Sequence, residues 1–130
     1  MNKKISEAHN LAYENYDRPL KKHETVMLQL IQKYKSENEI NVLDIGCADG
    51  LFLDVMSRNI ECGIVVGIDN DNSLVARALD RKYKSTDSNI LLMDIVDLAK
   101  PENQLKHKKF DFIIASGIFG FFDEFDHILA

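Results

Sequence analysis

The nine residues from Val42 to Gly50, Val-Leu-Asp-Ile-Gly-Cys-Ala-Asp-Gly, constrain the fold of this 130-residue chain more than any other segment. The apolar run before Gly46 is typical of a short buried strand, and the small residues after it are typical of a tight turn. From Leu51 onward the apolar residues recur at helical spacing. A strand, a small-residue turn and a helix start form the cradle in which α/β proteins bind an adenosine-containing ligand.

Three more apolar runs follow this strand at regular intervals, and each is nearly continuous rather than alternating. The four predicted strands span residues 42–45, 64–68, 90–93 and 110–115. Continuous apolar runs are typical of parallel strands that helices cover on both faces. The intervening segments predict helices over 51–59 and 72–83, the second capped by Asn72 or Ser73, and a short or irregular helix within 96–109. The sequence therefore predicts a doubly wound, Rossmann-like α/β sheet.

The residues before the first strand have a different character. Residues 6–17 are polar with spaced tyrosines, and Arg18-Pro19 separates them from an apolar helical stripe over 20–35. We expect residues 1–40 to form an N-terminal helical arm or lid and residues 41–130 to form the ligand-binding domain. A last helix is expected over 121–129.

Composition narrows the class of protein and its location. The net charge of −5 argues against a nucleic-acid-binding surface. Two basic clusters are interpreted as solvated faces; they contain Arg77, Arg81, Lys82 and Lys84, and Lys106, Lys108 and Lys109. The two cysteines do not form a disulfide framework or a metal-binding pair. With no signal peptide and no membrane-length apolar run, the chain is expected to be a reduced cytoplasmic protein without a metal or a membrane partner.

The carboxyl ends of the predicted strands carry the candidate site, since open parallel sheets bind ligands there. After the first strand, the small residues between Gly46 and Gly50 allow a ligand to approach the backbone, and their N–H groups are expected to point outward. After the second strand, Asp69 follows Gly50 by 19 residues and stands beside Asn70. A carboxylate there accepts hydrogen bonds from both hydroxyls of a ribose.

The third and fourth strands end on further candidate residues. Asp94 and Ile95 offer an acid and an apolar neighbour for an adenine, and Ser116 with Gly117 leaves room for the reactive end of a ligand. Each feature has a simpler interpretation by itself, because the glycines also suit a plain turn and Asp69 or Asp94 also suits a helix cap. Their order on successive strand ends favours a nucleoside-type ligand.

These motifs resemble those of the class I S-adenosylmethionine-dependent methyltransferases, from about residue 20 onward. Residues 42–50 match the family motif acid-x-Gly-x-Gly-x-Gly, with Ala48 in place of the middle glycine. Residues 65–69, 89–94 and 110–115 are similar to the later elements in the right order. The resemblance implies a seven-stranded sheet of order 3-2-1-4-5-7-6. This chain supplies the first four strands, so it is expected to be truncated after the fourth.

The resemblance also implies a cofactor, S-adenosylmethionine, and a role for each matching residue. Asp44 and the turn of Gly46, Cys47, Ala48 and Gly50 would hold its methionine part. Asp69, with Asn70, would hold the ribose, and Asp94 with Ile95 the adenine. Ser116 would lie near the sulfonium and the acceptor, and Tyr16 would cover the cofactor.

The expected function is methyl transfer to a small-molecule acceptor, with no nucleic acid as partner. The histidines are candidate bases by residue type alone, and no catalytic residue is assigned; they are His9, His23, His107 and His127. A nicotinamide-dependent dehydrogenase would need the fingerprint G-x-G-x-x-G, but the chain has Ala48 and Leu51 at the required glycines.

A different alternative is a truncated or non-catalytic protein that binds the cofactor without transferring a methyl group. If the sheet stops after the fourth strand, residues 110–115 form an apolar edge strand, which tends to associate with other strands. We therefore expect self-association or a partner chain at this edge.

Overall fold

The computed structural model describes residues 18–115, whose strands form one parallel sheet in the order β3-β2-β1-β4. The strands are β1 (Ile40–Ile45), β2 (Cys62–Asp69), β3 (Ser85–Leu92) and β4 (Phe112–Ile114). The helices are α2 (Lys22–Tyr34), α3 (Leu51–Asn59), α4 (Asn72–Leu79) and the 3-10 helix η1 (Ile95–Ala99). This order confirms the predicted Rossmann-like α/β fold.

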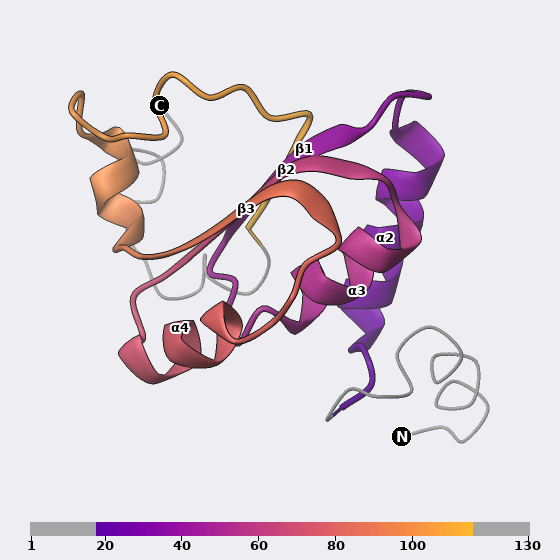
Figure 1. Cartoon of the computed structure of the whole chain (residues 1–130), viewed down its shortest axis with the longest axis horizontal. Coiled ribbons are helices and arrows are strands. Elements are labelled where there is room, and N and C mark those ends of the chain that lie inside the picture. The colour runs from indigo at the N-terminus through magenta and orange to yellow at the C-terminus, as the bar shows by residue number, and fades with distance from the viewer. Residues whose placement is uncertain (1–17, 116–130) are drawn as a thin grey trace.

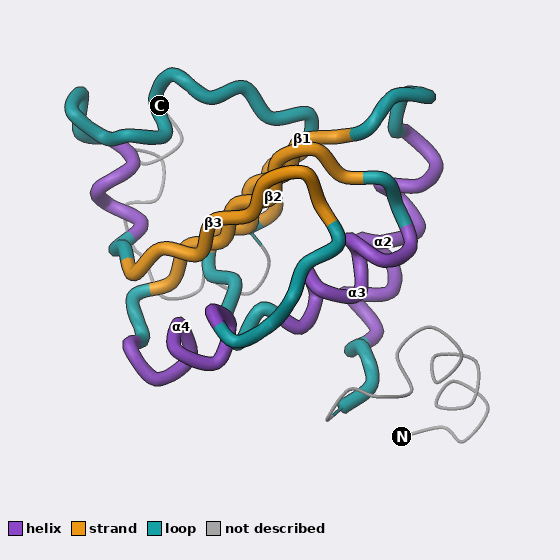
Figure 2. The backbone as a smooth tube through the Cα atoms, viewed as in Figure 1, coloured by secondary structure: helices purple, strands orange, loops and turns teal. Residues whose placement is uncertain are grey.

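The two faces of the sheet are covered unequally. Figure 1 shows α2, α3 and α4 together on one side of the strands. The core on that side joins Val42 and Val65 of the sheet to Leu51 and Leu53 of α3, and all four side chains are fully buried. On the other face, Figure 2 shows η1 and the loop that follows it. A smaller core lies there, around residues such as Val66.

The register of the sheet places Asp44 at its centre. Asp44 pairs with Gly67 of β2 on one side and with Ile114 of β4 on the other. Successive strand residues point to opposite faces, so Asp44 shares the helix-covered face with Val42. A carboxylate is thereby held in the interior, at the end of β1 where the turn begins.

Several predicted boundaries are wrong, for identifiable reasons. Strand β3 begins at Ser85 rather than Ile90, because its polar first half pairs with β2 along an exposed edge and needs no apolar residues. Helix α4 ends at Leu79 rather than Tyr83. Its N-cap is Asp71, whose carboxylate accepts from the backbone N–H groups of residues 73 and 74. The predicted caps Asn72 and Ser73 are instead the first residues of the helix.

The predicted apolar stripe of α2 is only partly buried. Ile31 belongs to the core and Met27 packs against it. By contrast, Val26, Leu30 and Tyr34 are 44%, 49% and 67% exposed. The first 17 residues of the predicted N-terminal arm and the helix predicted over 121–129 lie outside the described residues. Within residues 18–115, none of the helices has the length and apolar character that a membrane crossing requires.

Candidate cofactor site

The turn after β1 has a left-handed backbone at three positions. Gly46 and Gly50 have φ of 80°, and Ala48 has φ of 51°. Glycine adopts such angles without steric cost, whereas alanine does so at about 1–2 kcal/mol. At Gly50 a Cβ atom would also collide with the hydroxyl of Tyr83. The glycine at position 50 is therefore required by backbone geometry and by space.

The N–H groups of this turn are used to hold the turn itself. Gly46 and Cys47 both donate to the carbonyl of Ile68, at 2.8 and 2.9 Å. Ala48 donates to Oδ2 of Asp69 at 2.9 Å. The prediction that these N–H groups point outward is therefore wrong for residues 46–48. The end of β2 binds them because the parallel register brings it alongside the turn.

A cavity of about 190 Å³ opens where β1 meets the turn. The N-terminal part of the described chain and the strand-turn-helix unit form its walls together. The lining residues are Arg18, Lys21, His23, Glu24, Met27, Asp44, Gly46, Cys47, Ala48, Asp49 and Phe52. The structure thus brings four of the predicted site residues, Asp44 and residues 46–48, around one space.

Asp44 is the chemically distinctive group of this cavity. Its residue is only 5% exposed, and among residues 18–115 none donates a hydrogen bond to its carboxylate. Burial, together with the nearby carboxylates of Glu24 and Asp69, raises the pKa of Asp44 to about 7. A cationic ligand would stabilise the ionised form, so the site favours a positively charged partner.

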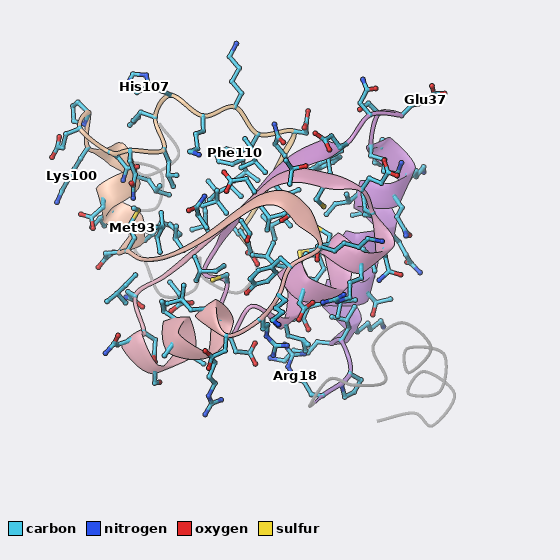
Figure 3. The ribbon with its side chains drawn as sticks, in the orientation of Figure 1. Arg18, Glu37, Met93, Lys100, His107 and Phe110 are labelled. Atoms are coloured by element: carbon cyan, nitrogen blue, oxygen red, sulfur yellow. The ribbon has the colours of Figure 1, made fainter. Side chains whose placement is uncertain are left out.

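An ion pair at the start of α2 supplies charge of both signs beside Asp44. Arg18 binds Glu24 through two hydrogen bonds, Nη1 to Oε1 at 2.8 Å and Nη2 to Oε2 at 3.2 Å. The backbone N–H of Lys21 also donates to Glu24, at 2.8 Å. Although burial alone would raise it, these bonds and the Arg18 charge hold the pKa of Glu24 below its usual value. Figure 3 shows Arg18 on the helix-covered side of the sheet.

Asp69 and Asn70 lie at the end of β2, beside the cavity rather than in its lining. The carboxylate of Asp69 is half-buried and joins two backbone segments, because it accepts from Ala48 N–H and, through Oδ1 at 2.9 Å, from Asp71 N–H. Each carboxylate oxygen still has a second lone pair for a ligand. Asn70 is exposed.

Asp94 and Ile95 lie after β3 and already have structural partners. Asp94 Oδ1 accepts from Val96 N–H at 3.2 Å, which makes Asp94 the N-cap of η1. This is the simpler role that the sequence left open. The side chain of Ile95 is 7% exposed and packs in the smaller core.

The remaining predictions for the site have mixed outcomes. The side chain of Cys47 is buried, and burial raises the pKa of its thiol, so the residue reaches the cavity as a protonated neighbour rather than as a nucleophile. His23 lines the cavity with an exposed side chain, whereas His107 is exposed near η1 on the other side of the sheet. Ser116, Tyr16, His9 and His127 lie outside the described residues. Among residues 18–115, no group of three or more acidic, histidine or cysteine side chains is placed to hold a metal ion.

Sequence reasoning missed three charged residues around the turn: Arg18, Glu24 and Arg81. The first two are separated by the Pro19 break and a helix start, and neither matches a motif. Arg81 was interpreted as part of a solvated cluster, but its side chain is 16% exposed and binds Asp49 and Asp54. No local sequence signal indicated the Arg81 contacts, since they join residues 27 and 32 positions apart.

A second, more open cavity of about 350 Å³ lies at the amino ends of β2 and β3. Its walls include Glu39, Arg58, Cys62, Lys84 and Ser85. None of the predicted site residues lines it. The chemistry expected of this fold is therefore concentrated at the opposite ends of the strands.

The chain belongs to the methyltransferase domain family, whose model matches residues 43–130, more than half of the chain. A curated relative is malonyl-[acyl-carrier protein] O-methyltransferase 1 of Ilyobacter polytropus, which is 24% identical over an alignment of 122 residues that covers 91% of this chain. The structure is similar to the plantazolicin methyltransferase BpumL in complex with SAH, with a TM-score of 0.63, 24% identity and 82% of this chain covered. It is also similar to magnesium protoporphyrin IX methyltransferase of Synechocystis PCC 6803 with bound SAH, with a TM-score of 0.54, 15% identity and 90% of this chain covered.

These matches cover only part of the similar proteins. The chain spans 42% of the curated relative, 38% of BpumL and 55% of the Synechocystis enzyme. The resemblance to class I S-adenosylmethionine-dependent methyltransferases is confirmed at the level of family and fold.

Proposed function

We propose that this chain is the cofactor-binding part of a methyltransferase that uses S-adenosylmethionine and methylates a small molecule. The observation that carries the proposal is the buried carboxylate of Asp44, which lines a cavity together with the glycine turn and Arg18. A buried carboxylate is costly unless a cation accompanies it. The methionine part of the cofactor offers an ammonium group for Asp44 and a carboxylate for Arg18.

The other predicted residues would hold the nucleoside part. In this proposal the turn from Gly46 to Gly50 packs against the cofactor, and Asp69 with Asn70 binds the ribose hydroxyls. Asp94 and Ile95 border the adenine. Support comes from their positions, because these residues follow β1, β2 and β3, which are neighbours in the sheet. Solved structures of similar fold contain S-adenosylhomocysteine, the product form of the cofactor.

The main task of the protein in methyl transfer would be to align the methyl group with the acceptor. Bound S-adenosylmethionine supplies a methyl group that its positively charged sulfur already activates. The residues of the chain would hold this group in line with the acceptor and exclude water. We propose that residues 1–40 act as the lid, since residues 18–27 already wall the cavity, and that Ser116 lies near the reacting centre. No base is assigned, because a base is needed only for some acceptors.

A small-molecule acceptor is favoured over nucleic acid. Three of the similar proteins are named for plantazolicin, magnesium protoporphyrin IX and malonyl-[acyl-carrier protein], none of which is a nucleic acid. The net charge of −5 also opposes binding to phosphate backbones. The free thiols of Cys47 and Cys62 support a reducing, cytoplasmic location.

We propose in addition that the outer edge of β4 pairs with a further strand, from elsewhere in the protein or from a partner chain. One edge of β4 pairs with β1, and among residues 18–115 no strand pairs with the other. Ile113 of this strand is 62% exposed. An exposed apolar edge strand is a template for such pairing.

Calorimetry with S-adenosylhomocysteine tests the cofactor assignment. Asp69→Ala should weaken binding by at least about tenfold, because it removes charge-assisted hydrogen bonds to the ribose and the support of Ala48 N–H. The matched control is Asp71→Ala, which removes the cap of α4 next to the site and should change the affinity less than about twofold. No binding by the wild type, or equal binding by both variants, would count against the proposal.

Methyl transfer separates the catalytic function from the non-catalytic alternative. The purified protein is incubated with S-adenosylmethionine carrying a labelled methyl group and with small acids, phenols and amines as acceptors. Formation of a labelled product supports the catalytic function. Cofactor binding without labelled product on any acceptor supports a chain that binds the cofactor without using it.

A further inference from the structure

The segment that follows α4 contacts the glycine turn at two points. Nε of Arg81 donates to the backbone carbonyl of Asp49 at 2.7 Å, and Nη2 lies 3.4 Å from Asp49 Oδ2. The hydroxyl of Tyr83 donates to the carbonyl of Ala78 at 2.8 Å and occupies the space that a Cβ on Gly50 would need. Residues 81–83 therefore pack directly on the turn.

The early end of α4 makes this contact possible. The N–H groups of Asp80 and Arg81 bond to carbonyls three residues back, those of Arg77 and Ala78, so the last turn tightens and the helix stops. Had the helix continued to Tyr83, as its sequence pattern predicted, the Arg81 side chain would have followed the helix surface. Instead the chain turns back and the guanidinium is largely buried.

Asp49 is the residue of the turn that this contact controls. It stands between Ala48 and Gly50, which both have left-handed backbones. Its Oδ1 accepts from Leu51 N–H at 3.2 Å, at the first residue of α3, and its side chain lines the candidate cavity. The orientation of Asp49 thus affects both the start of the helix and the shape of the cavity.

We propose that Arg81 is a positioning residue for the cofactor turn, holding Asp49 so that the cavity beside Asp44 keeps its ligand-binding shape. The inference rests on the proposed function, because the ligand concerned is the proposed cofactor. The end of β2 holds residues 46–48 of the turn, and Arg81 holds residue 49. Two anchors are needed because left-handed conformations are intrinsically unfavourable for Ala48.

Arg58 provides a matched comparison within the same charge network. Nη1 of Arg81 lies 3.4 Å from Asp54 Oδ2, and Nε of Arg58 donates to Oδ1 of the same carboxylate at 3.0 Å. Arg58 also donates to the carbonyl of Lys82 at 2.7 Å, and its side chain is 43% exposed. Both arginines therefore tie α3 to the segment after α4, but Arg81 is the one bonded to the turn at Asp49.

The experiment compares Arg81→Gln, Arg58→Gln and Arg81→Lys in the full chain. For each variant we would measure the free energy of unfolding, the affinity for S-adenosylhomocysteine, and the exchange of the Gly50 and Leu51 amide hydrogens without ligand. Arg81→Gln should weaken binding about tenfold and speed exchange at these amides by a similar factor. Arg58→Gln should change the affinity less than about twofold, whatever its effect on stability. Arg81→Lys should recover only part of the affinity, because an ammonium keeps the charge but cannot make all the contacts of the guanidinium with Asp49 and Asp54.

Two results would overturn the inference. One is a loss of affinity that follows the loss of stability equally in the two glutamine variants. The other is unchanged exchange at Gly50 and Leu51 in Arg81→Gln. If the wild type does not bind S-adenosylhomocysteine, the proposed function fails, and the exchange in the ligand-free protein still decides whether Arg81 positions the turn.

Discussion

The two faces of the sheet differ in how completely residues 18–115 bury their apolar side chains. On the helix-covered face, α2, α3 and α4 enclose a core in which residues such as Val42, Leu53 and Val65 have no exposed surface. On the other face, η1 and its loop leave Val96 and Ile113 48% and 62% exposed. The candidate cavity lies on the first face. The walls of this cavity therefore belong to the better-covered face of the sheet.

The largest expected effect tests whether the core on the helix-covered face contributes more to stability than the core on the other face. Leu53→Ala should lower the free energy of unfolding by about 3 kcal/mol, because it leaves a cavity among fully buried neighbours. Ile113→Ala removes a similar number of carbon atoms from a mostly exposed site and should cost less than about 1 kcal/mol. Urea denaturation of both variants measures the difference. Equal losses would mean that the second face is as well packed as the first.

A smaller effect concerns the buried acid of the covered face. The pKa of Asp44 is raised to about 7, so the folded chain binds this proton more tightly than the unfolded chain does. Its contribution to stability is present at about pH 4, declines as the pH rises, and is lost above about pH 7. Asp44→Asn cannot ionise and should be more stable than the wild type at pH 8, by an amount on the order of 2 kcal/mol.

The measurement is the difference in unfolding free energy between Asp44→Asn and the wild type, without ligand, from pH 4 to pH 8. Both proteins contain the other carboxylates, so taking the difference cancels their titration. Glu24 is one of them: its pKa is lowered, so its stabilising effect is lost as the pH falls. A difference that does not grow with pH would show that the fold does not destabilise the ionised form of Asp44. The same variant should lose affinity for S-adenosylhomocysteine, since an amide is a weaker partner for an ammonium group.

The smallest expected effect on stability lies at the open edge. Ile113→Lys should change the free energy of unfolding by less than about 0.5 kcal/mol, because the side chain is mostly exposed. It should nevertheless suppress association through β4, since a charge on an edge strand opposes pairing. Sedimentation of the wild type and the variant over a range of concentrations measures this. Identical concentration-independent masses would argue against a partner at this edge.

Local sequence patterns were sufficient to predict the order of the strands and helices and the position of the turn after β1. The apolar runs predicted all four strands, and helix α3 was predicted with its observed bounds. The small residues at 46, 48 and 50 were recognised as a turn, and each has the left-handed backbone that such residues permit. Boundaries failed where pairing or capping outweighs local pattern. The polar residues 85–89 form a strand because β2 pairs with them, and α4 stops before its apolar pattern ends.

The site residues also fall into those that the sequence predicted and those that only the structure revealed. Residues within the motif, such as Asp44 and Gly46, were identifiable because their roles depend on near neighbours in the chain. Arg18, Glu24 and Arg81 were not, because each acts on the site through contacts made by folding. The outward direction expected for the turn N–H groups was also wrong, since Ile68 and Asp69 accept them once β2 lies alongside.

The sequence by itself determined the class of fold and the location of the candidate site, because strand, turn and helix signals and the backbone freedom of glycine are properties of short segments. Only the tertiary structure decided how the turn after β1 is held. It brings a carboxylate from β2 and a guanidinium from beyond α4 onto the turn, and it buries Asp44 near the start of α2. The physical reason is that burial, charge pairing and pKa depend on distances between residues remote in sequence, which are set when the parallel strands pair.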